Sequence, residues 1–414
     1  MSLTVWDQSD GSMLPHTLAP RKNLMDELIA TLSAAEREHG ERLVKLIHAD
    51  IDAAGGWLDF QSFMNLALYA PGLGYYSAGA HKLGAGGDFT TAPEISPLFS
   101  RCVAVQCAQV LQHLGEGSVL ELGAGSGVMA VVMLREFERL GSLPDRYYIL
   151  EVSADLRARQ QALLQQELPQ HSHRLCWLDA LPDNFIGIII ANEVLDALPI
   201  QRFCIQQGQV QAIGVSYTEQ GLVWQPRPAS AALHAAVQTI QTNLQLQFPE
   251  GYCSEVNLQL AGWVGSLAAS LRRGALLCID YGYPQHQYYS VERMQGTLSC
   301  FFRQHVHHQP LINVGLQDIT AWVDFTAVAT AGMDAGLELS GFATQAHFLL
   351  GCGLDRLLAD LAEQPDALRW QLSQQVQKLT MPNEMGENFK AIAFNKDCDI
   401  ELDGFALRDL RDRL

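Results

Sequence analysis

The spacing of apolar residues changes once along the chain, near residue 116. Before it, apolar residues recur three and four positions apart, as in amphipathic helices, and a glycine-rich stretch interrupts them over 72–99. After it, short and almost wholly apolar runs alternate with longer amphipathic segments. We predict that these runs are strands: SVLELG, RYYILEV, RLCWLD, FIGIIIANE and RGALLCIDYGYP. Because such alternation is typical of parallel strands joined by right-handed helical crossovers, the sequence predicts an α/β fold with a doubly wound, mostly parallel sheet.

The same pattern divides the chain into regions. We expect a flexible N-terminus over 1–20, a helical and glycine-rich region over 21–115, and the α/β domain over 116–414, with an insertion near 284–350. Within the domain, residues 202–226 favour antiparallel strands around a Gln-Gly turn, and residues 254–271 favour a helix. A final strand is expected within 385–397.

Composition limits the class of protein. Hydrophobic residues make up 48% of the 414 residues and charged residues 17%, which favours a large core and argues against bulk disorder. The net charge of −18 argues against nucleic-acid binding, which requires a basic face. Since no apolar run approaches ~20 residues, we expect no membrane insertion. The first twenty residues resemble neither a secretory signal nor a transit peptide, so we expect a cytoplasmic protein.

Cysteine usage points to a reducing compartment. Nine cysteines are scattered over 102–398 without a CxxC pair, and an odd count without framework spacing predicts reduced thiols. Cys176, Cys204 and Cys278 lie in apolar runs, where we expect them to be small core residues. The histidine-rich segment RQHVHHQP has no carboxylate or cysteine nearby at ligand spacing, so no metal site is predicted.

The strongest local signal is the motif VLELGAGSG. It contains, in order, Glu121, Gly123, Gly125 and Gly127. Glycines after a strand let the backbone turn tightly and approach a ligand, and the following helix presents free N–H groups. In the dinucleotide fingerprint GxGxxG the third glycine comes one place later, where this chain has Val128. An acid two residues before the first glycine therefore favours S-adenosyl-methionine, whose amino-acid end needs hydrogen-bonding groups; the alternative is a purely structural turn.

Two more acids follow predicted strands of the same sheet. Glu151 ends the second strand, where a carboxylate can accept both ribose hydroxyls of a nucleoside. The alternative for Glu151 is an acid stabilised by the N-terminus of the next helix. Asp179 ends the third strand, where it could receive the adenine amino group while Ala180 and Leu181 line the ring.

The stretch IIIANEVLDALPIQRF begins as a buried strand and continues with polar residues. Asn192, Glu193 and Asp196 follow the isoleucines. The carboxyl ends of parallel strands meet at one edge of the sheet, so we expect these side chains to face the same crevice as the glycine motif. Buried carboxylates are costly without a cationic partner. Arg202 is one candidate for that partner, and a cationic substrate is the other.

Several blocks of the sequence together resemble the complex I assembly-factor methyltransferases of mitochondria and their bacterial relatives. This family of class I adenosyl-methionine-dependent enzymes is similar to the protein arginine methyltransferases. The blocks recur in order over roughly 57–396: GLGYYSAGAHKLGAGGDFTTAPEISPLF, LELGAGSG, YYILEVSADLRARQ, IIIANEVLDALPIQRF, RGALLCIDYGYP, DITAWVDFT, TQAHFLLGCG and LTMPNEMGENFKAIAF. One departure is VMAVVML, where the family often has an Asp.

The resemblance implies N-methylation of a protein arginine, in the mitochondrial members on a complex I subunit. Methyl transfer from a sulfonium needs no metal, but it needs the nucleophile held against the methyl group without water. A guanidinium is charged and delocalised, and carboxylates around it would bind it bidentately and localise its charge. We expect Glu193, Asp196 and Asn192 to do this, together with Asp88 or Glu94.

The glycine-rich stretch that contains Asp88 has the composition of a lid. Gly84, Gly86 and Gly87 are expected to act as hinges, and Phe89 to cover the adenosine. A plain packed connection is the alternative. Tyr281, in the motif IDYG, is expected either to line the substrate channel or to be a buried tyrosine with a satisfied hydroxyl.

Other functions share parts of this pattern. A small-molecule or DNA methyltransferase would use the same cofactor, but the charge and the Asn-Glu-Val-Leu sequence after the fourth strand disfavour DNA. A non-catalytic assembly factor that binds adenosyl-methionine is a different class. An NAD-dependent oxidoreductase is disfavoured by the glycine spacing. The expected partner is a protein substrate that presents an arginine, and a homodimer is left open.

Overall fold

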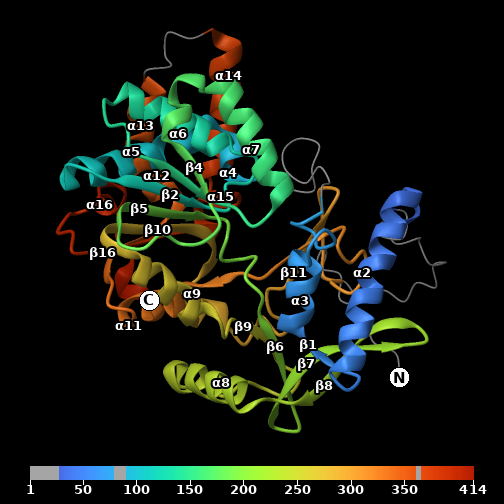
Figure 1. Ribbon diagram of the computed structural model, residues 1–414. Coiled ribbons are helices and arrows are strands. Elements are labelled where there is room, and N and C mark those ends of the chain that lie inside the picture. Colours follow the sequence, from blue (N-terminus) through green and yellow to red (C-terminus); the bar gives the residue numbers. More distant parts are fainter. Residues whose placement is uncertain (1–27, 79–89, 360–364) are drawn as a thin grey trace.

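The computed structural model describes residues 28–78, 90–359 and 365–414, and its elements form three sheets (Figure 1). The main sheet has the strand order β15 (Glu338–Thr344), β16 (Phe389–Lys396), β10 (Leu271–Tyr283), β5 (Phe185–Asn192), β2 (Ser118–Leu122), β3 (Tyr147–Leu150) and β4 (Leu175–Leu178), and β14 (Val323–Asp324) pairs with β10.

Most strands of the main sheet are parallel. β10, β5, β2, β3 and β4 run in one direction, whereas β16 runs antiparallel to both β10 and β15. The chain leaves β2 for β3 and β4 on one side and then returns to β5 on the other. This reversal between β2 and β5 is a topological switch point, where α/β folds bind ligands at the carboxyl ends of the strands. The predicted doubly wound α/β fold is confirmed.

Alternate residues of β5 enter two different cores, which explains its apolar sequence. Ile188 and Ile190 pack with α5 (Pro97–Leu114) and α6 (Val128–Arg139). Ile189 packs with α9 (Leu260–Ser270) and α11 (Phe325–Asp334), which cover the other face of the sheet (Figure 1). Gly187 interrupts the isoleucines because a Cβ there would lie 1.9 Å from the Ser118 carbonyl oxygen.

An antiparallel sheet lies beside the main sheet. It contains β1 (Leu58–Asp59), β7 (Gln209–Thr218), β6 (Gln201–Gln206) and β9 (Cys253–Val256), and β8 (Gly221–Pro228) pairs with β7. The predicted turn is confirmed, with left-handed φ values of 53° at Gln207 and 69° at Gly208. A helix is predicted over 254–271, and its predicted start is wrong. Residues 253–256 form β9, which pairs with β6, and the helix begins only at Leu260.

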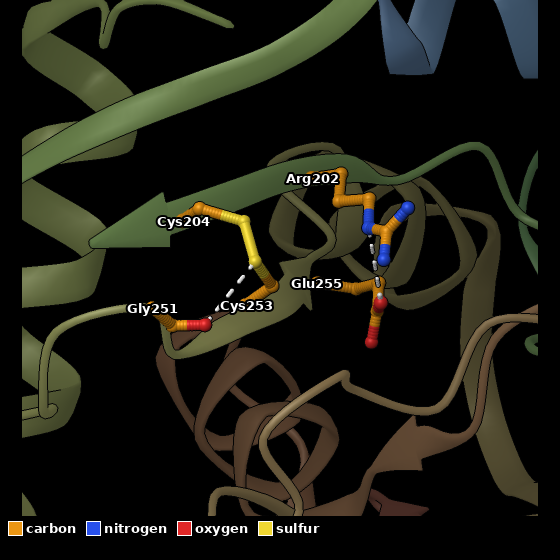
Figure 2. Close-up of a disulfide and its surroundings, with 5 residues drawn as sticks. All are labelled: Arg202, Cys204, Gly251, Cys253 and Glu255. Atoms are coloured by element: carbon orange, nitrogen blue, oxygen red, sulfur yellow. Dashed lines mark hydrogen bonds and ion pairs between the residues drawn. A yellow bond between two sulfur atoms is a disulfide. The ribbon is translucent and has the colours of Figure 1, made fainter. Parts of the chain in front are cut away.

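The prediction that all cysteines are reduced is wrong for Cys204 and Cys253. They lie directly opposite each other on β6 and β9, with Cα atoms 4.1 Å apart, and form a disulfide (Figure 2). The pair is separated by 49 residues in sequence, so only the strand pairing brings it together. The other seven cysteines are free thiols.

A small sheet of β12 (His305–His307), β11 (Ser299–Phe302) and β13 (Asp318–Thr320) completes the strands. The remaining helices are α2 (Ala34–Ala53), α3 (Phe60–Tyr69), α4 (Ala92–Ile95), α7 (Ala154–Glu167), α8 (Ala231–Leu244), α10 (Gln285–Tyr288), α12 (Gln345–Gly351), α13 (Leu354–Ala359), α14 (Asp366–Thr380), α15 (Met385–Asn388) and α16 (Asp403–Ala406), with 3₁₀ turns η1 (Pro169–Arg174) and η2 (Arg411–Arg413). Within the described ranges, no helix is long and apolar enough to cross a bilayer.

Residues 284–350, where an insertion is expected, contribute to two parts of the fold. Their first part supplies the small sheet, whereas α11 and β15 belong to the main layer, where β15 pairs with β16. The antiparallel sheet instead interrupts the chain between β5 and β10, and β1 joins it from the N-terminal region. β6 directly follows the loop that leaves β5, and Ala321, next to β13, donates its N–H to the Asp196 carbonyl oxygen at 3.0 Å, so both smaller sheets lie beside this loop.

Candidate active site

A cavity of about 990 Å³ opens at the carboxyl ends of β2, β3, β5 and β10. It extends from the glycine motif to the small sheet, and its wall includes Glu121, Gly123, Gly125, Glu151, Asn192, Glu193, Asp196, Tyr281, Asp318 and Trp322. This volume is at the upper end of the roughly 300–1,000 Å³ range of ligand sites. The cavity is therefore large enough for a nucleoside cofactor and part of a second reactant.

The glycine motif forms one end of the cavity. Gly123, Gly125 and Gly127 have left-handed φ values of 61°, 55° and 86°, which side chains disfavour. A Cβ on Gly123 would lie 3.3 Å from Val194, and one on Gly127 would lie 3.3 Å from Gln160. Gly123 and Gly125 line the cavity, whereas Gly127 is the N-cap of α6 behind it.

Gln160 of α7 connects the glycine motif to Glu151. Its Nε2 donates to the Gly125 carbonyl oxygen and to Glu151 Oε2, both at 2.9 Å, and its Oε1 accepts from Trp177 Nε1 at 3.0 Å. Glu151 Oε1 accepts from the backbone N–H of Ser153 at 2.9 Å. Nothing in the sequence singles out the fully buried Gln160, because a lone glutamine in a polar helix carries no signal.

Glu121 lies beneath the glycine motif. The Tyr147 hydroxyl donates to Glu121 Oε2 at 2.6 Å. Burial raises the pKa of Glu121 to about 7, against the effect of that hydrogen bond. Glu121 is thus an acid with a near-neutral pKa in the wall of the cavity.

The end of β4 differs from expectation. Asp179 forms an ion pair with Arg157, its side chain is 88% exposed, and it is not part of the cavity wall. Ala180 is exposed and also lies outside the wall, whereas Leu181 lines the cavity. β4 therefore contributes an apolar side chain to the cavity and not the expected acid.

The loop after β5 presents Asn192, Glu193 and Asp196 to the cavity, as the sequence predicted. Glu193 has a left-handed φ of 52°. Its Oε1 accepts from the backbone N–H of Ala92 at 3.0 Å and from Asn192 Nδ2 at 3.2 Å. Asp280, at the end of β10, accepts the backbone N–H groups of residues 194–196 and so holds the turn in place.

Several polar atoms in and beside this loop have no hydrogen-bond partner. Asn192 Oδ1 and Asp196 Oδ1 are buried without one, and so is the hydroxyl of Tyr281 on β10. Across residues 28–78, 90–359 and 365–414, no Arg or Lys forms an ion pair with Glu193 or Asp196. Such a set of acceptors is suited to a ligand that brings several N–H donors.

Arg202, the expected internal partner for these acids, points elsewhere. Its Nε lies 3.9 Å from Glu255 Oε1, and its guanidinium lies over the Trp224 ring at 4.8 Å from the centroid (Figure 2 shows the Arg202–Glu255 pair). This result removes the alternative in which Arg202 neutralises the loop after β5.

The acids of the loop have raised pKa values. Burial raises the pKa of Glu193 to about 8, and the charges of Asp196 and Asp318 act in the same direction. Burial raises the pKa of Asp196 to about 6. Burial and the neighbouring Asp196 and Glu193 also raise the pKa of Asp280. The cavity therefore favours either protons or a bound cation on its acids.

The helix α4 contacts both halves of the cavity. Ala92 donates to Glu193, and Glu94 accepts a hydrogen bond from the Ser126 hydroxyl of the glycine motif. Glu94 thus lies at the cofactor end and not beside Asp196. The predicted Gly84, Gly86, Gly87, Asp88 and Phe89 lie outside the described residues.

The histidine-rich segment makes local contacts. His305 Nδ1 lies 2.7 Å from the Arg303 carbonyl oxygen, and His308 Nδ1 lies 2.8 Å from that of Leu298. In the part of the chain that the structure describes, no three His, Cys, Asp or Glu side chains form a group suited to a metal ion.

These features define a ligand cavity at the switch point of an α/β sheet, of a size and position suited to a nucleoside cofactor. A comparison with known protein families leads to the same class of protein. Residues 102–343, more than half of the chain, match the family described as "Putative S-adenosyl-L-methionine-dependent methyltransferase". The chain belongs to this family and is a class I methyltransferase that uses S-adenosyl-methionine. The site is compatible with this cofactor, since Gly123 and Gly125 line the cavity without side chains and Glu151 lies in the same wall.

Individual relatives match along nearly the whole chain. A crystal structure of a candidate methyl transferase from Burkholderia thailandensis bound to S-adenosyl-homocysteine is 40% identical, with a TM-score of 0.88 over 93% of this chain and 99% of that one. The "Protein arginine methyltransferase NDUFAF7, mitochondrial" of Danio rerio is 29% identical over 90% of this chain and 92% of that protein. The Homo sapiens protein of the same name is 27% identical, over 82% and 80%.

Proposed function

We propose that this enzyme transfers the methyl group of S-adenosyl-methionine to a guanidinium nitrogen of a protein arginine. The observation that carries the proposal is the pair Glu193 and Asp196 at the cavity wall, with no ion-pair partner among the described residues. Buried acids in this state suit a cation that arrives with several N–H donors, which is the chemistry of arginine. The curated relatives named as protein arginine methyltransferases support the same substrate class.

When bound, S-adenosyl-methionine would supply the methyl group from its sulfonium, with the S–C bond breaking as the N–C bond forms and the thioether S-adenosyl-homocysteine as the leaving group. The residues of the protein prepare the nucleophile. Glu193 and Asp196 would bind two edges of the guanidinium and draw its positive charge away from the reacting nitrogen. Asn192 Oδ1 and the Tyr281 hydroxyl, both without partners, would accept or donate the remaining hydrogen bonds. As the new N–C bond forms, that nitrogen loses a proton, and a carboxylate whose pKa is raised is a suitable acceptor.

We assign the cofactor contacts to the opposite end of the cavity. Glu151 would accept the ribose hydroxyls, oriented by Gln160 and the Ser153 N–H. Gly123 and Gly125 would leave room for the amino-acid end. Glu121 remains a proposed contact near that end. Gly87, Asp88 and Phe89 stay predictions.

Asp179 and Ala180 were expected at the adenine. Leu181 was expected there too, and we propose it alone, since it lines the cavity and the other two do not.

An acceptor assay tests the proposed function. Purified enzyme and S-adenosyl-methionine with a labelled methyl group are incubated with an extract of cells that lack this gene, and the labelled proteins are hydrolysed to amino acids. We expect label in methylarginine. Label only in lysine or in small molecules, or no label from an enzyme that binds the cofactor, would contradict the proposal. A subunit of NADH dehydrogenase is the first purified acceptor to test.

A further inference from the structure

Asp318, outside the main sheet, lies in the same cavity as the acids of the loop after β5. We propose that Asp318 is a third carboxylate that contacts the substrate guanidinium, and that Tyr76 orients it for this role. The inference rests on the proposed function and extends it, because it assigns part of the substrate site to the small sheet.

Asp318 is held in one orientation. It begins β13, it is 2% exposed, and it lines the cavity. The Tyr76 hydroxyl lies 2.9 Å from Oδ1 and 3.0 Å from Oδ2, and the Ile319 N–H donates to Oδ1 at 2.9 Å. A buried carboxylate with fixed hydrogen bonds can present its remaining lone pairs in a defined direction.

The field of Asp318 reaches the other acids of the cavity. Its negative charge contributes to the raised pKa of Glu193, after burial and the charge of Asp196. It also contributes, after burial, to the raised pKa of Tyr69. Glu193 and Asp318 also line the same cavity, although they come from different parts of the fold. A guanidinium bound there can therefore feel both charges.

A second observation at the same wall also indicates a ligand. Thr320 lies two residues after Asp318 and thus on the same face of β13. It is 1% exposed, it lines the cavity, and its hydroxyl has no hydrogen-bond partner. The Tyr281 hydroxyl, at the same cavity, is also without a partner. The side chains of Thr320 and Asp196 both influence the pKa of Tyr281, so these three polar groups face one another at the cavity, where a polar ligand can complete their hydrogen bonds.

Two stacked tyrosines connect the wall of the small sheet to the loop after β5. The rings of Tyr69 and Tyr76 lie 5.5 Å apart with an angle of 22°. The Tyr69 hydroxyl donates to the Ala197 carbonyl oxygen at 3.0 Å, directly after Asp196. Tyr76 meanwhile contacts Asp318. One aromatic pair thereby fixes the position of Asp318 relative to Asp196.

This arrangement matches the donor geometry of arginine. A guanidinium presents five N–H donors in one plane, and a single carboxylate can accept only two of them along one edge. Glu193 and Asp196 lie on one loop and approach the guanidinium from one side. An acid from another sheet can accept N–H donors on an edge of the guanidinium that these two do not contact. The rings of Tyr69 and Tyr76 also line the cavity, where an arginine side chain would pass.

The variant Asp318→Asn tests the inference in the acceptor assay. It keeps the size of the side chain and removes its charge. We expect kcat/KM for the acceptor protein to fall roughly 100-fold, as for the loss of one partner of a buried charge pair. Cofactor affinity, measured by calorimetry, should stay within about twofold, because Asp318 belongs to the small sheet, whereas the residues assigned to the cofactor belong to the glycine motif and the end of β3.

Two further variants separate a substrate contact from a structural role. Tyr76→Phe keeps the charge of Asp318 and removes its hydroxyl partner, so we expect a smaller loss of about 3–30-fold. Asp324→Asn is the matched control, since Asp324 is also an acid within a short strand and is half-buried, but it caps α11 outside this cavity. The control should retain activity within about twofold, because an asparagine oxygen can still cap the helix.

The outcomes distinguish the inference from the function on which it rests. Methylarginine formation by Asp318→Asn at the wild-type rate would overturn the inference alone. Lost cofactor binding or a melting temperature far below that of Asp324→Asn would also overturn it, because Asp318 would then be structural. Failure of the wild-type enzyme to label arginine would overturn both proposals.

Discussion

Asp280 accepts a hydrogen bond from the backbone N–H of Leu195 at 2.8 Å, and through this contact β10 positions the turn that carries the substrate acids. The same oxygen accepts from Val194 at 3.1 Å and from Asp196 at 3.2 Å. Successive N–H groups around one carboxylate form an anion-binding concavity, which stabilises the left-handed conformation of Glu193. Asp280 is therefore a positioning residue for Glu193 and Asp196.

We predict that Asp280→Asn lowers kcat by about 10–100-fold, because an amide keeps only one acceptor oxygen, so its NH2 group must face either the three N–H groups of the turn or the Tyr281 N–H. The free energy of unfolding should fall by about 1–3 kcal/mol in urea titrations. Cofactor affinity should change little. An Asp280→Asn enzyme with wild-type kcat would show that the turn holds its shape without this carboxylate.

Substrate binding should release a proton. With a pKa of about 8, Glu193 is mostly protonated at pH 7 in the free enzyme, and a bound guanidinium favours its ionised form. Acceptor affinity should therefore rise with pH up to about 8, by at most about tenfold per unit. Calorimetry at pH 7 in buffers of different ionisation enthalpy measures the proton directly. A binding enthalpy that is independent of the buffer would contradict this prediction.

The same pKa predicts the stability of a variant. Folding raises the pKa of Glu193 from 4.5 to about 8. The contribution of this group to the free energy of unfolding is therefore complete below pH 4.5 and is lost as the pH rises through 8. Glu193→Gln cannot ionise, so it should be more stable than wild type at pH 9 and about equal to it at pH 4. Equal unfolding free energies of the two proteins at pH 9 would show that Glu193 titrates near its ordinary value.

Gly125→Val should abolish cofactor binding. Gly125 has a φ of 55° and lines the cavity, so a branched side chain there is strained and occupies the space of the ligand. We expect affinity for S-adenosyl-methionine to fall more than about 100-fold by calorimetry. Gly115→Val is the control, since Gly115 has a φ of 75° at the end of α5, where a Cβ meets nothing within 4 Å. The control shares the backbone strain and should still bind the cofactor.

The parts of the fold that follow from local pattern were predictable. The apolar run of β5 and the polar residues after it lie in one continuous segment, so Asn192, Glu193 and Asp196 could be placed at the crevice without a structure. Gly123 and Gly125 were also predictable from local sequence. Glycines spaced in this way after a strand mark a turn where the backbone can approach a ligand closely.

The parts that depend on distant pairing were not predictable. Tyr76 and Asp318 are 242 residues apart, and only the packing of the small sheet brings them together. The strand β9 has few residues and a polar sequence, so its pairing with β6, and the disulfide that follows from it, had no local signal. Asp179 looked like its neighbours at strand ends, but Arg157 holds it at the surface.

The most direct test of the account compares wild type and Glu193→Gln in the acceptor assay, with cofactor affinity measured on the same preparations. We predict that wild type forms methylarginine and that Glu193→Gln lowers kcat by about 100–1,000-fold while S-adenosyl-methionine affinity stays within about twofold. Methylarginine formation by Glu193→Gln at the wild-type rate would contradict the central claim that this carboxylate holds the reacting guanidinium.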